Sequence, residues 1–244
     1  MTKQLIVTAD DVGLDAGMTA GAIEAHRSGI VTACSIVANG RAFEDAAARL
    51  RDLPSLDIGV HLTLVEERSL TTGEAMPRNW MRFLVSRRGD VEGELRLQIE
   101  KVLASRLRVT HLNSHQHLHM LPSIFALVQR LATEYGIGYV RVVNDRGGHF
   151  GLRRLAAAFI AKGGGKPPHF IGFVEAGHLT ADRIIELLDY VEDTTELIAH
   201  PGINVRGYAH WHYAWDEETR ALCDPRVREA LAARRIELVA PSRL

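Results

Sequence analysis

Short apolar runs rich in β-branched residues alternate along the chain with longer segments in which apolar residues recur at helical spacing. The short runs predict strands, at residues 4–9, 32–38, 57–62, 108–113, 139–143, 170–174, 196–199 and 236–239. The longer segments predict helices, near residues 15–28, 42–52, 92–106, 122–135, 150–162, 180–192 and 217–233. Strands that alternate with helices favour a parallel sheet joined by right-handed crossovers.

The fold class follows from this alternation and from the length of 244 residues. We expect one α/β domain over residues 1–244, built as a TIM-like (β/α) barrel, although the pattern is also compatible with a doubly wound open sheet. Asp15 is placed to cap the helix that follows it, and Pro122 to occupy a first helical turn. Residues 66–91 predict a long irregular insertion that shapes the pocket.

Charge and cysteine content narrow the functional classes. The 29 Lys and Arg residues balance 30 Asp and Glu residues, with a formal net charge of -1, which excludes nucleic-acid binding driven by a strong positive field. Cys34 and Cys223 form neither a metal-binding spacing nor a disulfide framework, in keeping with a reducing compartment. The sequence shows no signal peptide and no run of about 20 apolar residues. We therefore expect a cytoplasmic protein without a membrane span, and a homo-oligomer is compatible with the sequence.

Asp10 and Asp11 directly follow the first predicted strand. Neighbouring carboxylates at a strand end diverge, so that one can bind a cation while the other acts as a base. The alternative is that one caps the next helix and the other is solvated. His61 interrupts an otherwise apolar run, and it is either a hydrogen-bonded core residue or a ligand.

A stretch at residues 110–122 carries four of the chain's 12 histidines. In an extended chain, alternate spacing places one set of side chains on one face, namely His111, Asn113, His115, His117 and His119. Burying several neutral imidazoles side by side is costly, so this face favours a metal or catalytic site over an ordinary polar strand. Two or three of these histidines could converge with Asp11 and His61, and the spacing leaves open which of them bind.

Three further signals are weaker. His200 ends a late predicted strand before a Pro-Gly turn, and it is either a turn residue or a catalyst. Arg141 lies in a predicted strand, where it needs a carboxylate partner or a bound anion. The aromatic residues Trp211, Tyr213 and Trp215 could form a sugar platform, but we expect them to fill the core. On a barrel, five polar side chains fall at the carboxyl ends of predicted strands, the face that holds active sites in such folds: Asp10, Asp11, His61, His115 and His200.

The motifs at residues 9–14, 29–32, 59–62 and 110–122 resemble those of the YdjC-like carbohydrate deacetylases, a family that includes chitooligosaccharide and hopanoid-associated deacetylases. The likeness continues more weakly at Arg141 and at His200 with the proline that follows it. The resemblance implies a distorted TIM-like barrel. It also implies removal of the acetyl group from an N-acetylated amino sugar, in an oligosaccharide or a glycolipid headgroup, with one divalent metal ion such as Mg²⁺ or Zn²⁺.

Carried over by position, the resemblance implies three metal ligands, Asp11, His61 and His115. Asp10 would be the base that activates water, and His200 the acid that protonates the leaving amine. The residues expected to contact the substrate are Arg141, His117 and His119. Two positions depart from the family's usual pattern: Val12 replaces a Phe, and Asn113 replaces an Asp that could orient a histidine.

Two other functions compete with this one. A phosphoesterase on the same barrel would favour further basic residues or a glycine-rich anion site near the metal, and only Arg141 fits that description. A carbohydrate- or metal-binding barrel without catalysis needs neither a base nor an acid. The presence of both Asp10 and His200 therefore favours an enzyme.

Overall fold

One parallel sheet organises the protein, whose computed structural model describes residues 3–86, 89–144 and 167–244. Its strands follow the order β5-β4-β3-β2-β1-β7-β6, and β8 pairs with β1. The strands are β1 (Lys3–Val12), β2 (Ala33–Ile36), β3 (Asp57–Leu62), β4 (Val109–Ser114), β5 (Tyr139–Val140), β6 (His169–Ile171), β7 (Thr194–Ala199) and β8 (Ile236–Leu238). Each lies within two or three residues of a predicted strand.

The central strand β1 is buried from residue 5 to residue 12. Strand β7 pairs with residues 4–9, whereas β8 pairs with residues 3–5 and β2 with residues 8–12. The strands β5 and β6 lie at the two edges, and within the described ranges no pairing joins them, so the barrel is not closed there. The predicted α/β fold with a distorted barrel is confirmed, whereas the extent of one domain over residues 1–244 stays a prediction.

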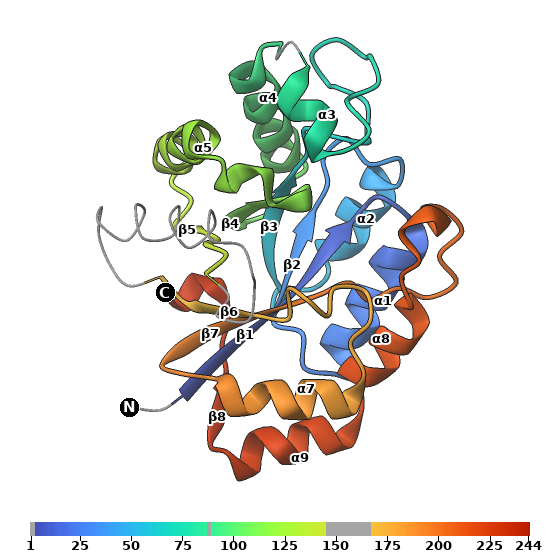
Figure 1. Ribbon diagram of the computed structural model, residues 1–244, viewed down its shortest axis with the longest axis vertical. Helices are drawn as coiled ribbons and strands as arrows, with labels where there is room; N and C mark the ends of the chain where they lie inside the picture. Colours follow the sequence, from blue (N-terminus) through green and yellow to red (C-terminus); the bar gives the residue numbers. More distant parts are fainter. Residues whose placement is uncertain (1–2, 87–88, 145–166) are drawn as a thin grey trace.

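Helices cover the outside of the curled sheet (Figure 1). They are α1 (Ala16–Arg27), α2 (Phe43–Leu50), α3 (Trp80–Val85), α4 (Val91–Ala104), α5 (Pro122–Glu134), α7 (Ala181–Leu187), α8 (Trp215–Leu222) and α9 (Pro225–Ala233). Short 3-10 helices are η1 (His115–Met120), η3 (Leu188–Tyr190), η4 (Ala209–Trp211) and η5 (Pro241–Arg243). Of the helices in the described part of the chain, none is long and apolar enough to cross a membrane.

Local signals account for several helix boundaries. Asp15 caps α1 by accepting a hydrogen bond from the backbone N–H of Gly17 at 2.8 Å, and Pro122 begins α5, both as predicted. The helix predicted at residues 217–233 is instead two helices, α8 and α9. Asp224 caps α9, and Pro225 follows it with no N–H to continue α8. The helix predicted at residues 150–162 lies outside the described residues.

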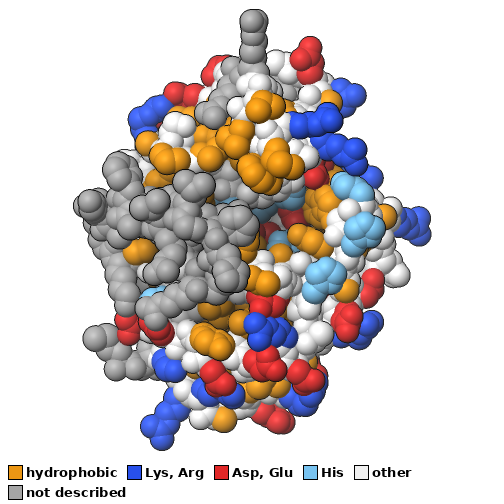
Figure 2. Space-filling view, in the orientation of Figure 1, with side chains coloured by type: hydrophobic (Ala, Val, Ile, Leu, Met, Phe, Trp, Pro, Cys, Tyr) orange, Lys and Arg blue, Asp and Glu red, His pale blue; other side chains and the backbone are white. Residues whose placement is uncertain are grey.

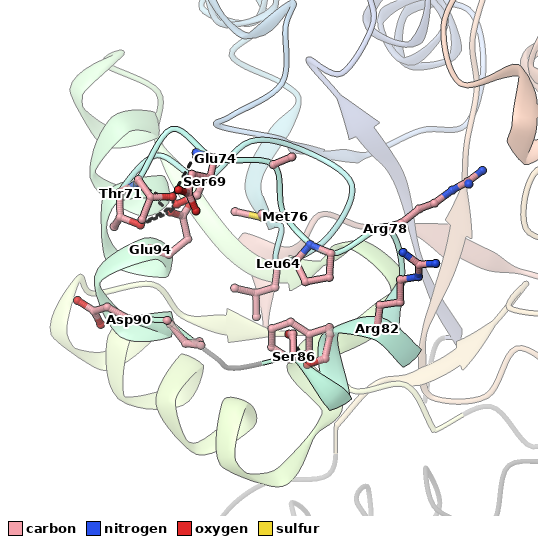
Figure 3. A pocket seen from close by; sticks show the side chains of 16 residues that line it. Leu64, Ser69, Thr71, Glu74, Met76, Arg78, Arg82, Ser86, Asp90 and Glu94 are labelled. Carbon is pink, nitrogen blue, oxygen red and sulfur yellow. Dashed lines mark hydrogen bonds between the residues drawn. The ribbon is translucent and has the colours of Figure 1, made fainter.

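The insertion at residues 66–91 is mostly irregular, as predicted, but it contains the short helix α3, which the sequence analysis missed. Asn79 caps this helix by accepting from the backbone N–H of Arg82. The buried carboxylate of Glu94 in α4 accepts hydrogen bonds from Ser69 and Thr71 and so ties the insertion to the barrel. A pocket of about 620 Å³ lies between the insertion and α4 (Figure 3).

Candidate metal and catalytic site

A pocket of about 300 Å³ lies at the carboxyl ends of the strands. Its lining includes five side chains that come from β1, from β3 and from the residues after β4 and β7: Asp10, Asp11, His61, His115 and His200. Figure 2 shows this face hollowed, with histidine and acidic side chains inside the hollow and apolar side chains on its rim. The structure thus brings together the five residues that the sequence places at strand ends.

A bulge near the end of β1 directs two consecutive aspartates into the same pocket. In a regular strand Asp10 and Asp11 would point to opposite faces of the sheet. Here the pairing of β1 with β2 shifts register between Ala9 and Val12, and Asp11 has a left-handed backbone with φ 64°. Such a conformation is uncommon for a residue other than glycine and is typical of functional sites. Both carboxylates therefore line the pocket, although each is less than 5% exposed.

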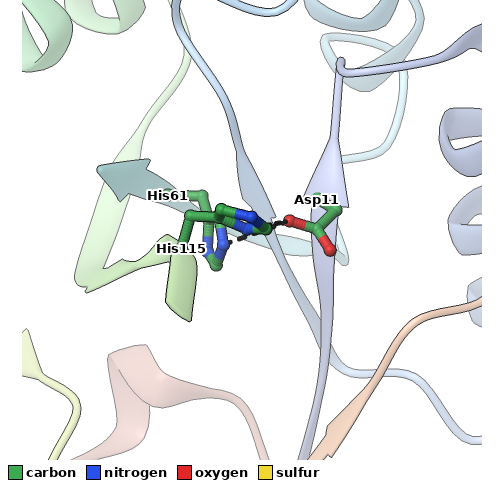
Figure 4. A group of neighbouring side chains, drawn as sticks. All are labelled: Asp11, His61 and His115. Atoms are coloured by element: carbon green, nitrogen blue, oxygen red, sulfur yellow. Dashed lines mark hydrogen bonds and ion pairs between the residues drawn. The ribbon is translucent and has the colours of Figure 1, made fainter. Parts of the chain in front are cut away.

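Asp11, His61 and His115 form a compact group of metal-ligand atoms (Figure 4). Oδ1 of Asp11 lies 3.2 Å from Nε2 of His61 and 3.0 Å from Nδ1 of His115. One ligand atom from each residue lies within 4.8 Å of the others. Two imidazole nitrogens and a carboxylate oxygen suit zinc-like ions, and they also admit harder divalent ions when further positions stay available to water. The donor set therefore fits one divalent cation without selecting its identity.

Electrostatics reinforce this group. Burial alone would raise the pKa of the Asp11 carboxyl, but the charge and hydrogen bond of His115, together with those of His61, hold that pKa well below its ordinary value. Burial conversely disfavours the charged form of His115, yet Asp11 and Glu66 outweigh it and raise the pKa of this histidine to about 10. The site thus concentrates negative potential where the two imidazoles converge.

Asp10 has a different set of partners. The two terminal guanidinium nitrogens of Arg141 donate to it, Nη1 at 2.5 Å to Oδ2 and Nη2 at 3.0 Å to Oδ1. Burial opposes ionisation of this carboxyl, but the Arg141 charge lowers its pKa below the ordinary range. Arg141 is fully buried and also pairs with Glu196, which accepts hydrogen bonds from the hydroxyls of Thr8 and Tyr139. Arg141 therefore has two carboxylate partners, Asp10 and Glu196.

His200 follows β7 in a turn that hydrogen bonds with side chains of α8 hold in place. Its backbone N–H donates to Oε1 of the buried Glu218 at 2.5 Å, and the hydroxyl of Thr219 bonds to both the N–H and the C=O of Gly202. The ring packs edge-on against Tyr213, with centroids 5.2 Å apart, and Nε2 lies 4.0 Å from Oδ2 of Asp11. Burial lowers the pKa of this imidazole. The turn and the packing of the ring together place His200 beside Asp11.

The histidine-rich stretch does not stay extended, contrary to the expectation of one shared face. Strand β4 ends at Ser114, and the chain continues as the 3-10 helix η1, in which Gln116 and His117 have φ near 50°. His117 lines the pocket. His119 is buried, and its ring bonds to the hydroxyl of Ser114 at 2.7 Å and to the backbone carbonyl of Arg141 at 3.0 Å. Burial lowers the pKa of His119 to about 3.

Substrate contacts expected of Arg141 and His119 conflict with this burial. The lining of the pocket includes His117 but neither of the other two. Arg141 and His119 are at most 1% exposed. The guanidinium of Arg141 is engaged by Asp10 and Glu196, and the ring of His119 by Ser114 and the backbone carbonyl of residue 141. They lie beneath the pocket and support the residues that line it.

The aromatic residues near the carboxyl terminus do more than fill the core. Trp215 and Trp211 pack against a small apolar cluster formed by Leu14, Met18 and Val37. Trp211 also stacks on His115, with ring centroids 5.1 Å apart and planes 25° apart, and Tyr213 lines the pocket. The expectation of core filling is therefore wrong for Tyr213 and incomplete for Trp211.

Three carboxylates near the site are not predicted from the sequence. Glu66 accepts from the indole N–H of Trp211 at 2.9 Å and lies 3.7 Å from Nε2 of His115. Glu196 interrupts the strand β7 just as Arg141 interrupts the apolar run predicted at residues 139–143, and this signal could have paired the two. Glu218 lies in a charged helical segment, and nothing in its sequence neighbourhood distinguishes it from solvent-exposed acids.

Sequence comparisons relate the chain to a known family. The family described as YdjC-like protein matches residues 4–233. A carbohydrate deacetylase from Geobacillus stearothermophilus is 33% identical over 251 residues, which cover 98% of this chain and 97% of that protein. Another carbohydrate deacetylase, from Brevibacillus brevis, is 38% identical over 142 residues, which cover 55% of this chain and 57% of that protein.

Solved structures of low sequence identity share the fold. The Bc1960 peptidoglycan N-acetylglucosamine deacetylase superposes with a TM-score of 0.58 at 12% identity, over 97% of this chain and 85% of that one. A family 4 carbohydrate esterase from Streptomyces lividans gives a TM-score of 0.54 at 11% identity, over 98% and 94% of the two chains. The distorted barrel is thus common to these proteins. Because the family match spans most of the sequence and the Geobacillus relative aligns almost end to end, the chain belongs to the YdjC-like family.

Proposed function

We propose that this protein is a metal-dependent hydrolase that removes the acetyl group from an N-acetylated amino sugar, in an oligosaccharide or a glycolipid headgroup. The observation that carries the proposal is the convergence of Asp10 and His200 on the pocket that also holds the Asp11, His61 and His115 group. A binding site alone would need only that group. The two carbohydrate deacetylases among the relatives support the substrate class.

The residues divide the chemistry of amide hydrolysis between them. Asp11, His61 and His115 would hold one divalent ion, Mg²⁺ or Zn²⁺, whose charge polarises an amide carbonyl and lowers the pKa of water. Asp10 remains ionised because of Arg141, and its carboxylate is held in place to accept the proton of the attacking water. As water adds to the acetyl carbon, the C–N bond breaks and the acetyl group leaves as acetate.

His200 completes the reaction by protonating the amine. An amine leaves an amide only when it takes up a proton, and His200 lies on the side of the pocket facing Asp11. Because burial lowers its pKa, the protonated imidazole gives up its proton readily. The aromatic side chains of Trp80 and Tyr213 border the same pocket and offer apolar faces to a sugar ring.

The direct test combines metal analysis with acetate release. The purified protein, reconstituted separately with Mg²⁺, Zn²⁺, Mn²⁺, Co²⁺ and Ni²⁺, is offered N-acetylglucosamine oligosaccharides, an N-acetylated glycolipid and a phosphomonoester. We expect one ion per chain and acetate from at least one of the N-acetylated sugars. Phosphate release without acetate release would favour a phosphoesterase, and sugar binding without either product would favour a non-catalytic barrel.

His200→Ala tests whether the reaction is amide hydrolysis with a proton donor. An activated aryl acetate expels a phenolate that needs little protonation, whereas the amine of an N-acetyl sugar needs it strongly. The variant should therefore lose roughly a hundredfold or more of its rate on the sugar and retain most of its rate on the ester. Equal losses on both substrates would remove His200 from the role of acid.

A further inference from the structure

We propose that Asn113 is a positioning residue that fixes which nitrogen of His61 faces the metal site and ties this ligand to Asp10. The inference rests on the proposed metal site. Asn113 lies in β4 opposite His61 of β3 in the register of the sheet, and its side chain is fully buried. It contacts both Asp10 and His61, which belong to strands on either side of β2.

The orientation of the Asn113 amide follows from its partner Asp10. Arg141, which can only donate, gives hydrogen bonds to both oxygens of the Asp10 carboxylate, so these oxygens act as acceptors. The atom of Asn113 that lies 2.9 Å from Oδ1 of Asp10 must therefore be the amide nitrogen. The second N–H of this nitrogen reaches the hydroxyl of Ser35 at 2.8 Å. A flipped amide would set its carbonyl oxygen against the carboxylate, with two acceptors facing each other.

The orientation of Asn113 then decides the tautomer of His61. With its nitrogen turned to Asp10, Asn113 presents its carbonyl oxygen 2.8 Å from Nδ1 of His61. An amide oxygen cannot donate, so Nδ1 carries the hydrogen. A neutral ring, the form that binds a metal, then has its lone pair on Nε2, and a cation would take the place of the proton that this nitrogen shares with Oδ1 of Asp11, 3.2 Å away. One chain of donors and acceptors thus runs from Arg141 through Asp10 and Asn113 to the metal-facing nitrogen.

An amide suits this position better than a carboxylate. A carboxylate at residue 113 could still accept from His61, but it could not donate to Asp10, and it would place a second negative charge about 3 Å from the first. Asn113 satisfies both neighbours at once with no added charge. A single side chain therefore holds the proposed base and one proposed ligand in register, as supporting hydrogen bonds do in metal sites generally.

The test compares three variants. Asn113→Leu removes the three hydrogen bonds of Asn113 with similar volume, and Asn113→Asp keeps the acceptor facing His61 but loses the donor facing Asp10. Ser35→Ala removes the neighbouring hydroxyl, which also bonds to His111, and leaves the contacts of Asn113 with Asp10 and His61. Zinc affinity is measured by competition with a chromophoric chelator. Ring nitrogen signals of His61 in the zinc-loaded protein report which nitrogen binds and which carries the hydrogen.

We expect the wild-type spectrum to show coordination through Nε2 and a protonated Nδ1. Asn113→Leu should weaken zinc binding by about 10- to 100-fold. Asn113→Asp should bind no more weakly than the wild type and keep the Nδ1 hydrogen, and Ser35→Ala should stay within about threefold of the wild-type affinity. Coordination through Nδ1 in the wild type would overturn the proposal. The proposal would also be overturned if Asn113→Asp bound zinc as weakly as Asn113→Leu.

These readouts separate the inference from the proposed function. Zinc affinity and the His61 signals do not depend on acetate release, so a protein that binds zinc as expected but releases no acetate would refute the deacetylase and leave the role of Asn113 intact. Should Asn113→Leu fail to fold, the wild-type spectrum and the Asn113→Asp variant still decide the question.

Discussion

Asp10 and Asp11 are neighbours in sequence and equally buried, yet their surroundings differ in kind. Asp10 is held by the permanent charge of Arg141 and by the amide of Asn113. Among the described residues, the ion-pair partners of the Asp11 side chain are imidazoles, those of His61 and His115 and, more distantly, His200. A carboxylate paired with arginine keeps its charge and its position. A carboxylate surrounded by imidazoles can share a cation with them once their protons are gone.

Glu218 shows what burial does to a carboxyl group whose hydrogen bonds come from the backbone. It is fully buried, and within the described part of the chain it accepts from the backbone N–H groups of His200 and Leu179. Burial raises its pKa to about 8, whereas Arg141 lowers that of the equally buried Asp10. The difference between these carboxyls therefore comes from the partner and not from depth in the protein.

Replacing any one of the three proposed metal ligands should have the largest effect, a loss of metal binding. In Asp11→Asn, His61→Ala or His115→Ala, we expect metal affinity to fall by at least about a hundredfold, because even the loss of a supporting partner costs about 10- to 100-fold. Activity should fall with it. Metal content is measured on the purified variants after dialysis. The control is His26→Ala, since His26 bonds to Val31 and Ser55 far from the pocket. Full occupancy in all three site variants would refute the ligand set.

Asp10→Asn should separate the two aspartates. The amide keeps the shape of the side chain but cannot accept a proton from water, so we expect kcat to fall roughly a hundredfold or more, with near-normal metal content. The measurement pairs acetate release with metal quantification. Asp57→Asn serves as the control, because the Asp57 side chain is absent from the pocket lining and accepts a hydrogen bond from the backbone of Ser242 near the carboxyl terminus. Parallel loss of metal and activity would instead make Asp10 a ligand.

Arg141→Met should act mainly on stability. It leaves the carboxylates of Asp10 and Glu196 buried without their cation, and breaking a buried ion pair in this way costs about 3–5 kcal/mol. Urea unfolding measures the free energy. Arg226→Met provides the exposed counterpart, since the Arg226 side chain is 57% exposed in its ion pairs and should lose at most about 1 kcal/mol. Similar losses in both variants would show that burial of the Arg141 pair has no special weight.

Glu218 gives the most specific effect, a slope in stability with pH. Its pKa is about 8 in the folded protein, against an ordinary value of 4.5, so between these values the unfolded chain loses a proton that the folded protein retains. Its contribution to the unfolding free energy therefore falls as pH rises from about 5 to 8, by at most about 1.4 kcal/mol per unit. Glu218→Gln should remove this part of the slope. An unchanged slope in the variant would refute it.

The alternation of strands and helices could be predicted because burial dictates it locally. Residues 57–62 form a strand as predicted, since nearly every side chain in this apolar run is buried. The helix α3 could not be found, because a six-residue helix inside a polar insertion lacks two full turns of apolar spacing. The division between α8 and α9 had a signal, Asp224-Pro225, that the continuous helical period concealed.

The sequence by itself determined which chemical groups reach the end of the barrel, because residues at the carboxyl ends of parallel strands share one edge. It determined neither that two consecutive aspartates share one pocket nor that Arg141 supports Asp10 instead of a substrate. Those outcomes depend on a bulge in β1 and on contacts between residues 103 and 131 positions apart. Only the order and curl of the sheet bring such groups within hydrogen-bonding distance, and hydrogen bonds and charges act over a few ångströms in space and not along the chain.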